Sequence, residues 1–526
     1  MLNLGRNIYL KVLCFSGGIV IEVSSGREDF RIRLEQRRQL IKLGIYPYPH
    51  KYSITHTIPQ IVRDNSDKIT YPGSIRTAGR VMSIRKHGKS TFIDLIDQGT
   101  RLQAYLKADI LGNKYKIFLK YVRRGDILGA EGKIFRTRVG ELTILVKDYK
   151  ILCKALYSPP SQWYGLKDVE ERYRRRYLDL LLNEKVRRIF ILRSKIISEI
   201  RKFLAERGFI EVETPTIQPV YGGAAAKPFK TYVNALNEEW YLRISPELYL
   251  KRLVVGGLNK VFEMCKNFRN EDIDVKHNPE FTMIEIYEAY ADYNDMMKLT
   301  EEMISTVTQK VLGTTKIKYP IKIKQNSKVK IKEVEIDFSP PWKRMTMFET
   351  IKKYSPEHFD VEDMSDEEIK EELEKLGIEI PGGYNRGLAI AKLFEEYCEE
   401  HLIQPTFILD YPKETTPLSK PHRKNPSLIE RFEGYIAGME IANAYTELND
   451  PVLQDELFRE QMERKRRGDI EAHEYDYDFV EALRYGMPPT GGLGIGIDRL
   501  IMILTGVTSI KEVILFPMLR RKKQES

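Results

Sequence analysis

The sequence predicts an α+β protein in which a small β-barrel precedes a larger domain of mixed helices and strands. Two observations predict this fold. Short β-type runs punctuated by glycine occupy residues 73–156, and strongly periodic helices alternate with β-type runs in the rest of the chain. With 526 residues, the chain has enough material for two or more domains.

The composition favours a globular protein. Charged residues make up 30% and hydrophobic residues 42% of the chain, and no apolar run approaches the roughly 18 residues that a membrane-spanning helix needs. We therefore expect no membrane partner. A net charge of +10 favours a polyanionic partner such as nucleic acid, although an ordinary solvated surface could carry the same excess of basic residues. The four cysteines are scattered, without a C-x-x-C pair, which indicates a reducing compartment.

Residues 1–26 are expected to form a poorly ordered extension. Two basic residues precede a short apolar run there, as in a transit peptide, but Gly17 and Gly18 interrupt the run. A cytoplasmic protein is the main expectation, and an additional organellar form is the weaker one. The stretch "FRIRLEQRRQLIKLG" then sets apolar residues at helical spacing among basic ones, so residues 27–72 are predicted to form a basic helical segment.

The β-type runs of residues 73–156 predict an OB-type barrel, because they are short and evenly punctuated by glycine. Such barrels bind single-stranded nucleic acid by stacking bases on aromatic side chains beside a basic groove. Phe92, with Arg85 and other basic residues nearby, is the candidate. A core phenylalanine flanked by ordinary surface charges is an equally weighted alternative.

After the barrel, successive prolines in "YSPPSQW" predict a linker, which we place at residues 157–176. The stretch "RIFILRSKIISEIRKFLAERG" predicts a helix that ends at Gly208, and "FIEVETPTI" predicts a strand after it. We expect one large domain over residues 177–520, with an acidic helical insertion near residues 345–400, and a basic tail at residues 521–526.

The stretch "FRNEDIDVKHNPEFTMIEIYEAY", from residue 268 to residue 290, predicts two strands separated by a polar loop. Alternation places Arg269 and Glu271 on one face of the first strand. In the second strand, one face carries Phe281, Met283, Glu285 and Tyr287. A polar face opposite an apolar one is costly in a core and suits the floor of a pocket, although an exposed ladder of salt bridges remains an alternative.

A second constellation lies in "LIERFEGYIAGMEIANAYTELNDP". A hairpin with a two-residue loop at residues 436–437 would set Glu433 directly opposite Glu440. Facing carboxylates destabilise a hairpin unless a cation such as Mg²⁺ lies between them, or one of them points to solvent. Further along the strand, the period of two places Asn443, Tyr445 and Glu447 on a shared face.

The stretch "PPTGGLGIGIDRLIMILTG" combines glycines at a strand end with Asp498, Arg499 and an apolar helical run. The glycines let the backbone approach a ligand, and the arginine suits a phosphate. The order of residues matches neither the dinucleotide-binding nor the Walker pattern.

These stretches resemble the three motifs of class II aminoacyl-tRNA synthetases: "EVETPTI" with Pro215, "FRNE" with "HNPEF", and "GIGIDR" with Arg499. A barrel before the catalytic domain is typical of subclass b. Together with "GGAAAKPF", "SPELYLK" and "EIANAYTELNDP", the motifs look most like lysyl-tRNA synthetases of the eukaryotic cytosolic type. The resemblance implies a catalytic domain built on an antiparallel sheet flanked by helices. Two departures are Asp272, where the family usually has glycine, and Leu493, where tryptophan is expected.

The resemblance implies a reaction that joins L-lysine to the 3' end of tRNA(Lys) by way of lysyl-adenylate, with ATP as substrate and Mg²⁺ as cofactor. Arg269 would contact the lysine carboxylate and the α-phosphate, and Arg499 the γ-phosphate. By the same resemblance, the remaining lysine-binding residues would be Gly223, Glu247, Glu285, Tyr287, Asn443, Tyr445 and Glu447. An acidic pocket of this kind suits a substrate with an ammonium group at each end.

The other expected ATP-binding residues are Asn270, Glu271, His277, Asn278, Phe281, Glu440, Ile441 and Gly496. Glu433 and Glu440 would hold Mg²⁺. In the barrel, the positions that match the family's anticodon-binding residues are Arg85, Phe92, Gln103 and Glu141.

The resemblance also implies a homodimer, with the first motif at its interface, and leaves open a place in a multisynthetase complex. An aspartate- or asparagine-specific relative is the rival interpretation, and it would need a cation where Glu285 and Glu447 stand. A protein that keeps the fold only as an RNA-binding scaffold is another, and it would be expected to have lost Arg269, Glu440 or Arg499.

Overall fold

We describe the protein from a computed structural model, whose described residues are 10–15, 18–23, 26–66, 71, 73–160, 166, 168–325, 328–356, 359–469 and 472–522. The chain divides into two compact units. Unit 1 is Met1–Arg172 with Tyr177–Glu184, and unit 2 is Tyr173–Arg176 with Lys185–Ser526.

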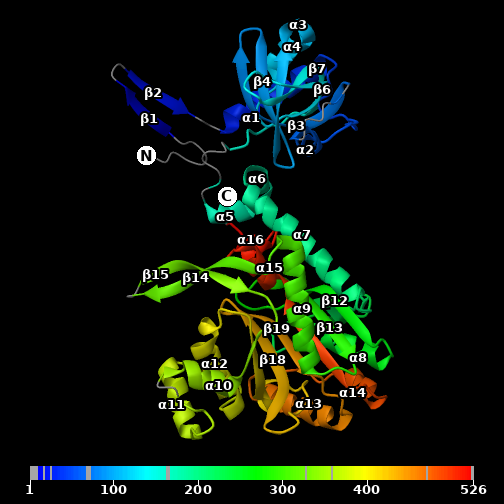
Figure 1. Ribbon diagram of the computed structural model, residues 1–526, viewed down its shortest axis with the longest axis vertical. Helices are drawn as coiled ribbons and strands as arrows, with labels where there is room; N and C mark the ends of the chain where they lie inside the picture. Colours follow the sequence, from blue (N-terminus) through cyan, green and yellow to red (C-terminus); the bar gives the residue numbers. More distant parts are fainter. Residues whose placement is uncertain are drawn as a thin grey trace. The chain divides into compact units, whose positions relative to one another are not determined.

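The centre of unit 1 is a closed barrel with strand order β3-β4-β5-β7-β6, which confirms the predicted OB-type barrel (Figure 1). Two short helices, α3 and α4, separate β5 from β6. The barrel elements are β3 (Ile75–His87), β4 (Ser90–Asp97), β5 (Thr100–Lys107), α3 (Ala108–Leu111), α4 (Asn113–Tyr121), β6 (Ile127–Arg136) and β7 (Leu142–Cys153).

Alternation along β4 decides which of its side chains enter the barrel. Ile93 and Leu95 are buried in the barrel core, whereas Phe92 is half-buried and lies outside that cluster. Successive side chains of a strand point to opposite faces. Phe92 therefore lies on the outer face of the barrel, which removes the alternative of a core phenylalanine.

The chain before the barrel contains the predicted basic helix, which is α1 (Gly26–Lys42), and a second helix, α2 (Ile58–Ser66). Leu40 of α1 is buried in the barrel's core cluster. Ahead of α1, β1 (Leu10–Phe15) pairs antiparallel with β2 (Gly18–Val23). The rest of the predicted extension at residues 1–26, apart from Gly26, lies outside the described residues.

Unit 2 is built on an eight-stranded sheet with the order β16-β17-β18-β19-β20-β13-β12-β8. All neighbours pair antiparallel except β16 with β17 and β8 with β12. Its strands are β8 (Ile210–Glu211), β12 (Lys260–Phe268), β13 (Glu280–Ala289), β16 (Lys343–Thr346), β17 (Thr406–Pro412), β18 (Leu428–Ile436), β19 (Met439–Thr446) and β20 (Thr490–Gly496).

Helices flank this sheet, in agreement with the predicted fold class. The α-helices of unit 2 and the two at its boundary are α5 (Val169–Arg174), α6 (Arg176–Leu182), α7 (Glu184–Ala205), α8 (Glu247–Val255), α9 (Tyr293–Leu312), α10 (Met347–Tyr354), α11 (Asp366–Leu376), α12 (Arg386–Cys398), α13 (Pro451–Arg466), α14 (Tyr477–Arg484), α15 (Ile497–Thr505) and α16 (Ile510–Val513). Short 3₁₀ turns follow α12 (Glu399–His401) and β17 (Lys413–Thr415).

The two faces of the sheet have different roles. On one face Ile284 and Ile286 of β13 join the main core cluster, together with side chains of α7, α9 and α15. The alternate residues of the same strand, Glu285 among them, line a cavity on the opposite face. The period of two predicted this division, because neighbouring side chains of a strand point to opposite faces.

Two predicted strands are shorter in the structure. The strand expected in "FIEVETPTI" is limited to Ile210–Glu211, and the last residue of the stretch, Ile217, begins a separate short strand. Pro215, which has no N–H to donate, lies between the two. The strand before the polar loop ends at Phe268, so Arg269 and Glu271 do not share a strand face. The backbone N–H of Arg269 donates to the carbonyl of Pro279 at 2.9 Å, which closes the loop instead.

Smaller elements decorate unit 2. Helices α10, α11 and α12 occupy the region where the helical insertion was predicted, and they gather in one lobe around a core of their own (Figure 1). Strands β14 (Lys316–Gln325) and β15 (Lys328–Asp337) form a two-stranded ribbon. Strands β9 (Ile217–Gln218), β10 (Phe229–Val233) and β11 (Glu238–Leu242) form a small sheet.

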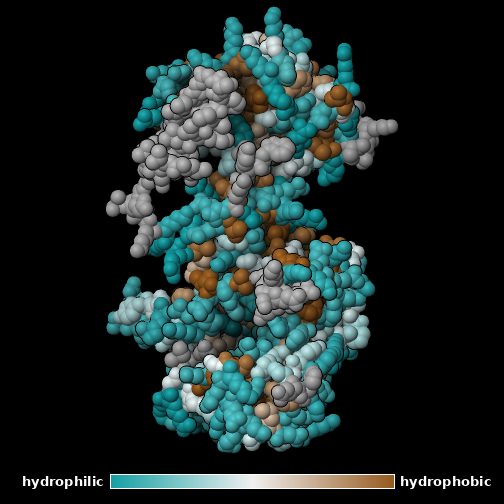
Figure 2. All heavy atoms as spheres, turned by 90° about the vertical axis from the view of Figure 1, so that its left-hand side faces the viewer, coloured by the Kyte–Doolittle hydropathy of each residue, from teal (hydrophilic) through white to brown (hydrophobic). Residues whose placement is uncertain are grey.

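Hydrophilic residues predominate on the face shown in Figure 2, and hydrophobic residues form separate patches among them. In the part of the chain that the structure describes, no helix combines the length and the apolar character needed to cross a membrane.

Candidate active site

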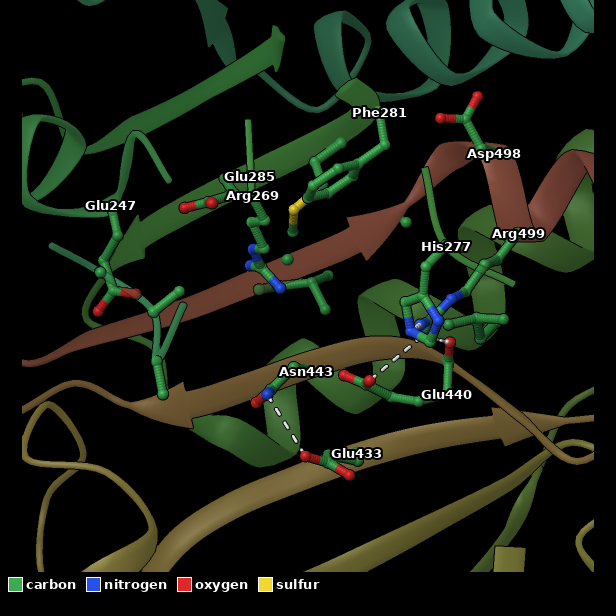
Figure 3. Close-up of a pocket in the computed structure, with 18 of the residues that line it drawn as sticks. Glu247, Arg269, His277, Phe281, Glu285, Glu433, Glu440, Asn443, Asp498 and Arg499 are labelled. Carbon is green, nitrogen blue, oxygen red and sulfur yellow. Dashed lines mark hydrogen bonds and ion pairs between the residues drawn. The ribbon is translucent and has the colours of Figure 1, made fainter. Parts of the chain in front are cut away.

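A cavity of about 370 Å³ opens on the polar face of the sheet in unit 2. Strands β13, β18, β19 and β20, the polar loop of residues 269–279 and the start of α15 surround it (Figure 3). Most of the predicted ligand-binding residues of the large domain line this cavity: Gly223, Glu247, Arg269, Glu271, His277, Asn278, Phe281, Glu285, Tyr287, Glu433, Glu440, Ile441, Asn443, Tyr445, Glu447, Gly496 and Arg499.

Asn270 is the exception. It does not line the cavity; its side chain is exposed, and its backbone N–H donates to the carbonyl of Lys227 at 2.7 Å. Asn278 does line the cavity, but its amide holds the loop. Its Nδ2 donates to the carbonyl of Glu280 at 2.6 Å, and its Oδ1 accepts from the backbone N–H of Met518 at 3.3 Å.

Arg269 presents its guanidinium to the cavity without a direct salt bridge to a described residue. Its guanidinium lies 5.2 Å from the centre of the Phe281 ring. Its Nε is buried and has no hydrogen-bond partner, and within the described residues it forms no salt bridge. A buried N–H without a hydrogen-bond partner is costly, and an anionic ligand would remove that cost. The arrangement therefore suits a carboxylate or phosphate beside an aromatic ring.

A hydrogen-bonded chain connects the polar loop to the start of α15. Arg499 donates to Nε2 of His277 at 2.9 Å, and Nδ1 of His277 lies 2.8 Å from Asp274. Since arginine only donates, Nε2 of His277 must accept, and the N–H at Nδ1 donates a hydrogen bond to Asp274. Arg499 also donates to the backbone carbonyl of Glu440 at 2.7 Å and to its carboxylate at 3.3 Å.

Asp498 anchors this part of the site, a role that the sequence did not reveal. Its carboxylate accepts from the backbone N–H of Thr282 at 2.7 Å and pairs with Arg193 of α7 at 2.5 Å. Arg193 also donates to the hydroxyl of Thr282 at 3.0 Å. These contacts tie α15, β13 and α7 together, and they fix the backbone from which Arg499 projects.

Three buried carboxylates gather at the other end of the cavity. Glu247, Glu285 and Glu447 are 3%, 4% and 0% exposed. Glu285 accepts from the hydroxyl of Ser245 at 2.8 Å and from that of Tyr287 at 3.2 Å. Burial, reinforced by the charge of Glu247, raises the pKa of Glu285 to about 8. Burial also raises the pKa of Glu447 to about 8 and that of Glu247 above its ordinary value.

Two cations of the site were missed by the sequence reasoning. Lys251 pairs with Glu247 at 2.7 Å and also with Glu447. Its position four residues after Glu247 was a usable signal, because residues at this spacing are neighbours on a helix such as α8. Arg431 pairs with Glu433, and its guanidinium lies 4.5 Å from the centre of the Tyr411 ring. The period of two places Arg431 and Glu433 on one strand face.

Glycines make room for the acidic cluster. Gly223 has a φ of +85°, which L-residues rarely adopt, and a Cβ there would lie 2.7 Å from the hydroxyl of Ser245. A Cβ at Gly492 would overlap the carboxylate of Glu447 and lie 2.7 Å from the ring of Tyr287. Both positions therefore exclude any side chain.

The hairpin that carries the predicted metal ligands has a different register from the predicted one. Its turn is at Ala437 and Gly438, both with positive φ, and the pairing shifts by one further residue between Gly434 and Tyr435. Tyr435 therefore lies opposite Glu440, and Glu433 lies opposite Asn443. The prediction of directly opposed glutamates was therefore wrong. Positive φ at both central residues is the geometry of a type I′ turn, which favours glycine and moved the loop by one residue.

Glu433 and Glu440 nevertheless line the same cavity. Burial raises the pKa of Glu440, and the charge of Glu433 adds to the effect; the Glu440 side chain, 35% exposed, still opens to the cavity. A divalent cation between the two carboxylates would relieve their repulsion, so the pair fits Mg²⁺ in charge and in donor type.

The contacts of Glu433 limit that fit. Its carboxylate accepts from the hydroxyls of Tyr411 at 2.9 Å and Tyr435 at 2.5 Å, pairs with Arg431, and lies 3.5 Å from the Asn443 amide. Direct coordination by Glu433 would therefore replace one of these donors. Among the residues with described positions, no group of three or more His, Cys, Asp or Glu side chains could hold a metal ion.

The predicted anticodon residues lie on the outer surface of the barrel. Phe92 stacks on Tyr105 with ring centres 4.4 Å apart, and both side chains are half-buried, so the stack is partly exposed on the barrel surface. Tyr105 was not predicted. Gln103 accepts from the hydroxyl of Thr143 at 3.0 Å. Arg85 lies opposite Phe92 in the strand pairing.

An ion-pair network holds the remaining two anticodon candidates. Arg85 pairs with Asp94 at 2.7 Å, and Arg101 connects Asp94 at 2.8 Å to Glu141. Burial acts to raise the pKa of Asp94, but the hydrogen bonds from Arg85, Ser83 and Arg101 lower it to about 2. Arg85 and Glu141 are therefore fixed on the barrel surface before any ligand arrives.

The two departures from the family pattern have different surroundings. Asp272 is exposed at the rim of the cavity. Leu493 lies on β20, is 1% exposed and belongs to the main core cluster, so it supports the sheet from the apolar side.

Comparisons with known proteins agree with this geometry. The family model "tRNA synthetases class II (D, K and N)" matches residues 168–520, and the model "OB-fold nucleic acid binding domain" matches residues 75–152. The chain is 55% identical over 501 residues to the lysine–tRNA ligase of Saccharolobus solfataricus, covering 94% of this chain and 98% of the relative.

Two further relatives extend the comparison beyond one genus. The lysine–tRNA ligase of Methanoculleus marisnigri is 48% identical, covering 93% of this chain and 94% of the relative. The lysine–tRNA ligase of Moorella thermoacetica is 50% identical, covering 94% of this chain and 98% of the relative. With the barrel, the sheet and the cavity in place, these matches show that the chain belongs to the lysine–tRNA ligase family of class II aminoacyl-tRNA synthetases.

Proposed function

We propose that this protein activates L-lysine with ATP to form lysyl-adenylate and pyrophosphate, and then transfers lysine to the 3' end of tRNA(Lys). The observation that carries the choice of lysine is the buried acidic cluster of Glu247, Glu285 and Glu447, which lines the same cavity as Arg269. A substrate with two ammonium groups and one carboxylate complements that distribution of charge.

In the first step, an oxygen of the lysine carboxylate attacks the α-phosphorus of ATP, and the bond from that phosphorus to the leaving pyrophosphate breaks. The carboxylate is already ionised at neutral pH, so no general base is needed. Arg269 is proposed to stabilise the charge that gathers on the α-phosphate, while Phe281 stacks on adenine. Catalysis then rests on alignment and on charge neutralisation.

In the second step, a hydroxyl of the terminal adenosine of the tRNA attacks the carbonyl carbon of lysyl-adenylate, and AMP leaves with the bonding electrons. Glu247 and the backbone at Gly223 are proposed to hold the α-amino group during both steps. Glu285, Tyr287 and Glu447 would hold the ε-ammonium, and Asn443 and Tyr445 would complete the wall.

The triphosphate end of ATP is assigned to the opposite side of the cavity. Arg499 is proposed to face the γ-phosphate, and His277 supports this role because it accepts a hydrogen bond from Arg499. Glu433 and Glu440 would hold Mg²⁺, which supplies charge neutralisation of the phosphates when bound. The ATP-binding role expected of Asn270 is the least supported, because Asn270 lies outside the cavity.

Anticodon recognition is proposed for the outer face of the barrel, with Phe92 as the stacking platform and with Arg85, Gln103 and Glu141 reading base edges. The half-buried stack of Phe92 on Tyr105 supports this assignment.

A homodimer is also proposed, with α7 and the strand after it at the interface. Ile191, Ile210 and Ile217 are 51%, 50% and 44% exposed, and they supply the apolar surface that such an interface needs. Analytical ultracentrifugation of the protein and of an Ile191→Glu variant would test it, since the charge should shift the protein to monomers.

Three narrower predictions stay predictions. A cytoplasmic location follows from the scattered cysteines, with an organellar form as the alternative. The archaeal and bacterial relatives above do not support the eukaryotic cytosolic type. Membership of a multisynthetase complex would be tested by whether other synthetases co-purify with the chain from its own cells.

Amino-acid-dependent exchange between pyrophosphate and ATP tests the proposed function directly. Exchange with L-lysine, and none with aspartate or asparagine, is the expected result. Exchange with aspartate or asparagine instead would mean that Glu285 and Glu447 had been misassigned. A lack of exchange with all three would favour the scaffold interpretation.

A further inference from the structure

Lys251 does not line the cavity, but it lies against two carboxylates that do, Glu247 and Glu447, at the amino acid end. Its side chain is fully buried, and its Nζ lies 2.7 Å from Oε1 of Glu247 and also pairs with Oε2 of Glu447. Glu247 and Lys251 lie one turn apart on α8, whereas Glu447 follows β19, nearly two hundred residues later. One ammonium thus connects two carboxylates from distant parts of the chain.

The two carboxylates have different proposed partners in the substrate. Glu247 is assigned to the α-amino group of lysine and Glu447 to the ε-ammonium. Lys251 therefore lies between the two ends of the amino acid site, on the protein side. Because Lys251 pairs with both carboxylates, the distance between Glu247 and Glu447 is fixed before the substrate arrives.

The charges of the acidic cluster and Lys251 balance those of a bound lysine. Three buried carboxylates and one ammonium leave a net charge of −2 when all are ionised. A bound lysine brings two ammonium groups, and its own carboxylate meets Arg269. The site is then neutral, which matters because an uncompensated buried charge is costly.

Lys251 keeps its charge in this environment. Burial acts to lower its pKa, but the charges of Glu247 and Glu447 outweigh burial and raise it above its ordinary value. The ring of Phe479 lies 5.8 Å from Nζ. The ammonium is therefore near two carboxylates and an aromatic ring.

We propose that Lys251 is a specificity-determining positioning residue, whose buried ammonium sets both the spacing and the net charge of Glu247 and Glu447. The site then accepts an amino acid with two ammonium groups separated by the length of a lysine side chain. This inference rests on the proposed assignment of those glutamates to lysine.

The first test is Lys251→Met, which keeps the length of the side chain and removes its charge. The KM for lysine in pyrophosphate exchange should rise about 10- to 100-fold, because the carboxylates lose a charged partner, while the KM for ATP should not change. The preference for lysine over ornithine, which is one methylene shorter, should fall in kcat/KM, because the spacing is no longer held. Unchanged lysine KM and preference would overturn the inference.

A matched control uses the next residue of the same helix. Arg252 pairs with Asp476 and does not line the cavity, so Arg252→Met should change thermal stability without changing the KM for lysine. An equal rise in KM in both variants would mean that disturbance of α8, not the charge at residue 251, was responsible.

A double-mutant cycle keeps the inference testable if Lys251→Met folds poorly. The variant with both Lys251→Met and Glu447→Gln removes the Lys251–Glu447 ion pair as a whole, so Lys251→Met should raise the KM for lysine by a smaller factor in the Glu447→Gln background than in the wild-type protein. Additive effects would contradict the inference. A wild-type protein without lysine-dependent exchange would instead defeat the proposed function.

Discussion

Arg499 donates a hydrogen bond from Nη2 to Nε2 of His277 over 2.9 Å, although the two residues are 222 positions apart. The contact joins the polar loop to the start of α15 at the end of the cavity assigned to the triphosphate. It holds an arginine, whose side chain is intrinsically mobile, in one orientation.

We expect His277→Leu to raise the KM for ATP by about 3- to 10-fold, because Arg499 loses an acceptor worth roughly 1 kcal/mol. The KM for lysine should not change. His401→Leu is a matched control, since both histidine side chains are 46% exposed and His401 lies outside the cavity. Equal effects of the two variants in pyrophosphate exchange would contradict the assignment.

The raised pKa values of Glu285 and Glu447, both about 8, predict that lysine binding depends on pH. Below that value the free site holds protons that an incoming ammonium must displace. Affinity for lysine should therefore rise between pH 6 and pH 8, with release of protons on binding. Calorimetry in two buffers of different ionisation enthalpy measures that release, and binding without proton release would be inconsistent with the prediction.

The same shifts affect the stability of the ligand-free protein. A carboxyl group whose pKa is higher in the folded than in the unfolded chain holds its proton more tightly when folded. Its contribution to the free energy of unfolding therefore falls as pH rises from its ordinary pKa of 4.5 to about 8. Glu285→Gln should flatten this dependence in thermal unfolding, and an unaltered slope would show that Glu285 does not cause it.

Glu440→Gln should lower the rate of pyrophosphate exchange by about 100-fold, because charge stabilisation at the phosphates is lost. It should also raise the Mg²⁺ concentration needed for half-maximal rate. Glu400→Gln, at a side chain that is 71% exposed, serves as the control. If the Mg²⁺ requirement did not change, Glu440 would not be a ligand.

Phe92→Ala should raise the KM for tRNA by about 10- to 100-fold, since stacking contributes roughly 1–3 kcal/mol per base. Pyrophosphate exchange, which needs no tRNA, should be unaffected. Val139→Ala, at a residue of unit 1 that is 90% exposed, should change neither quantity. A loss of pyrophosphate exchange in Phe92→Ala would indicate misfolding of the barrel or another role for Phe92.

Gly492→Ala should raise the KM for lysine at least 10-fold, because the new methyl group would displace the carboxylate of Glu447. Gly494→Ala on the same strand is the milder control: its Cβ would lie 3.1 Å from Cε of Met283, the far end of a flexible side chain. Similar KM values for lysine in the two variants would argue against a fixed position of Glu447.

The sequence alone identified the chemistry of the site where that chemistry depends on local geometry. The period of two along β13 separated Glu285 and Tyr287 from Ile284 and Ile286, and the structure has them on the cavity and the core side respectively. Alternation is a property of any extended backbone, so no tertiary information was needed.

The barrel was also predictable, because short alternating runs with glycine punctuation are the direct trace of strands and turns. The outer surface of the barrel was only partly predictable. Phe92 could be read either as a core residue or as a stacking platform until the strand pairing placed it beside Tyr105. Residues of two strands come together through pairing register, which a single run of sequence does not reveal.

The tertiary structure alone decided which charges meet. Lys251 and Glu447, or Arg193 and Asp498, are brought together by the packing of distant elements, and no local period encodes such pairs. It also decided the hairpin register, because the positive φ of Ala437 and Gly438 moved the turn, and the register shift between Gly434 and Tyr435 then set Asn443 opposite Glu433. The residue types thus came from the sequence, and their pairing came from the long-range contacts that fold it.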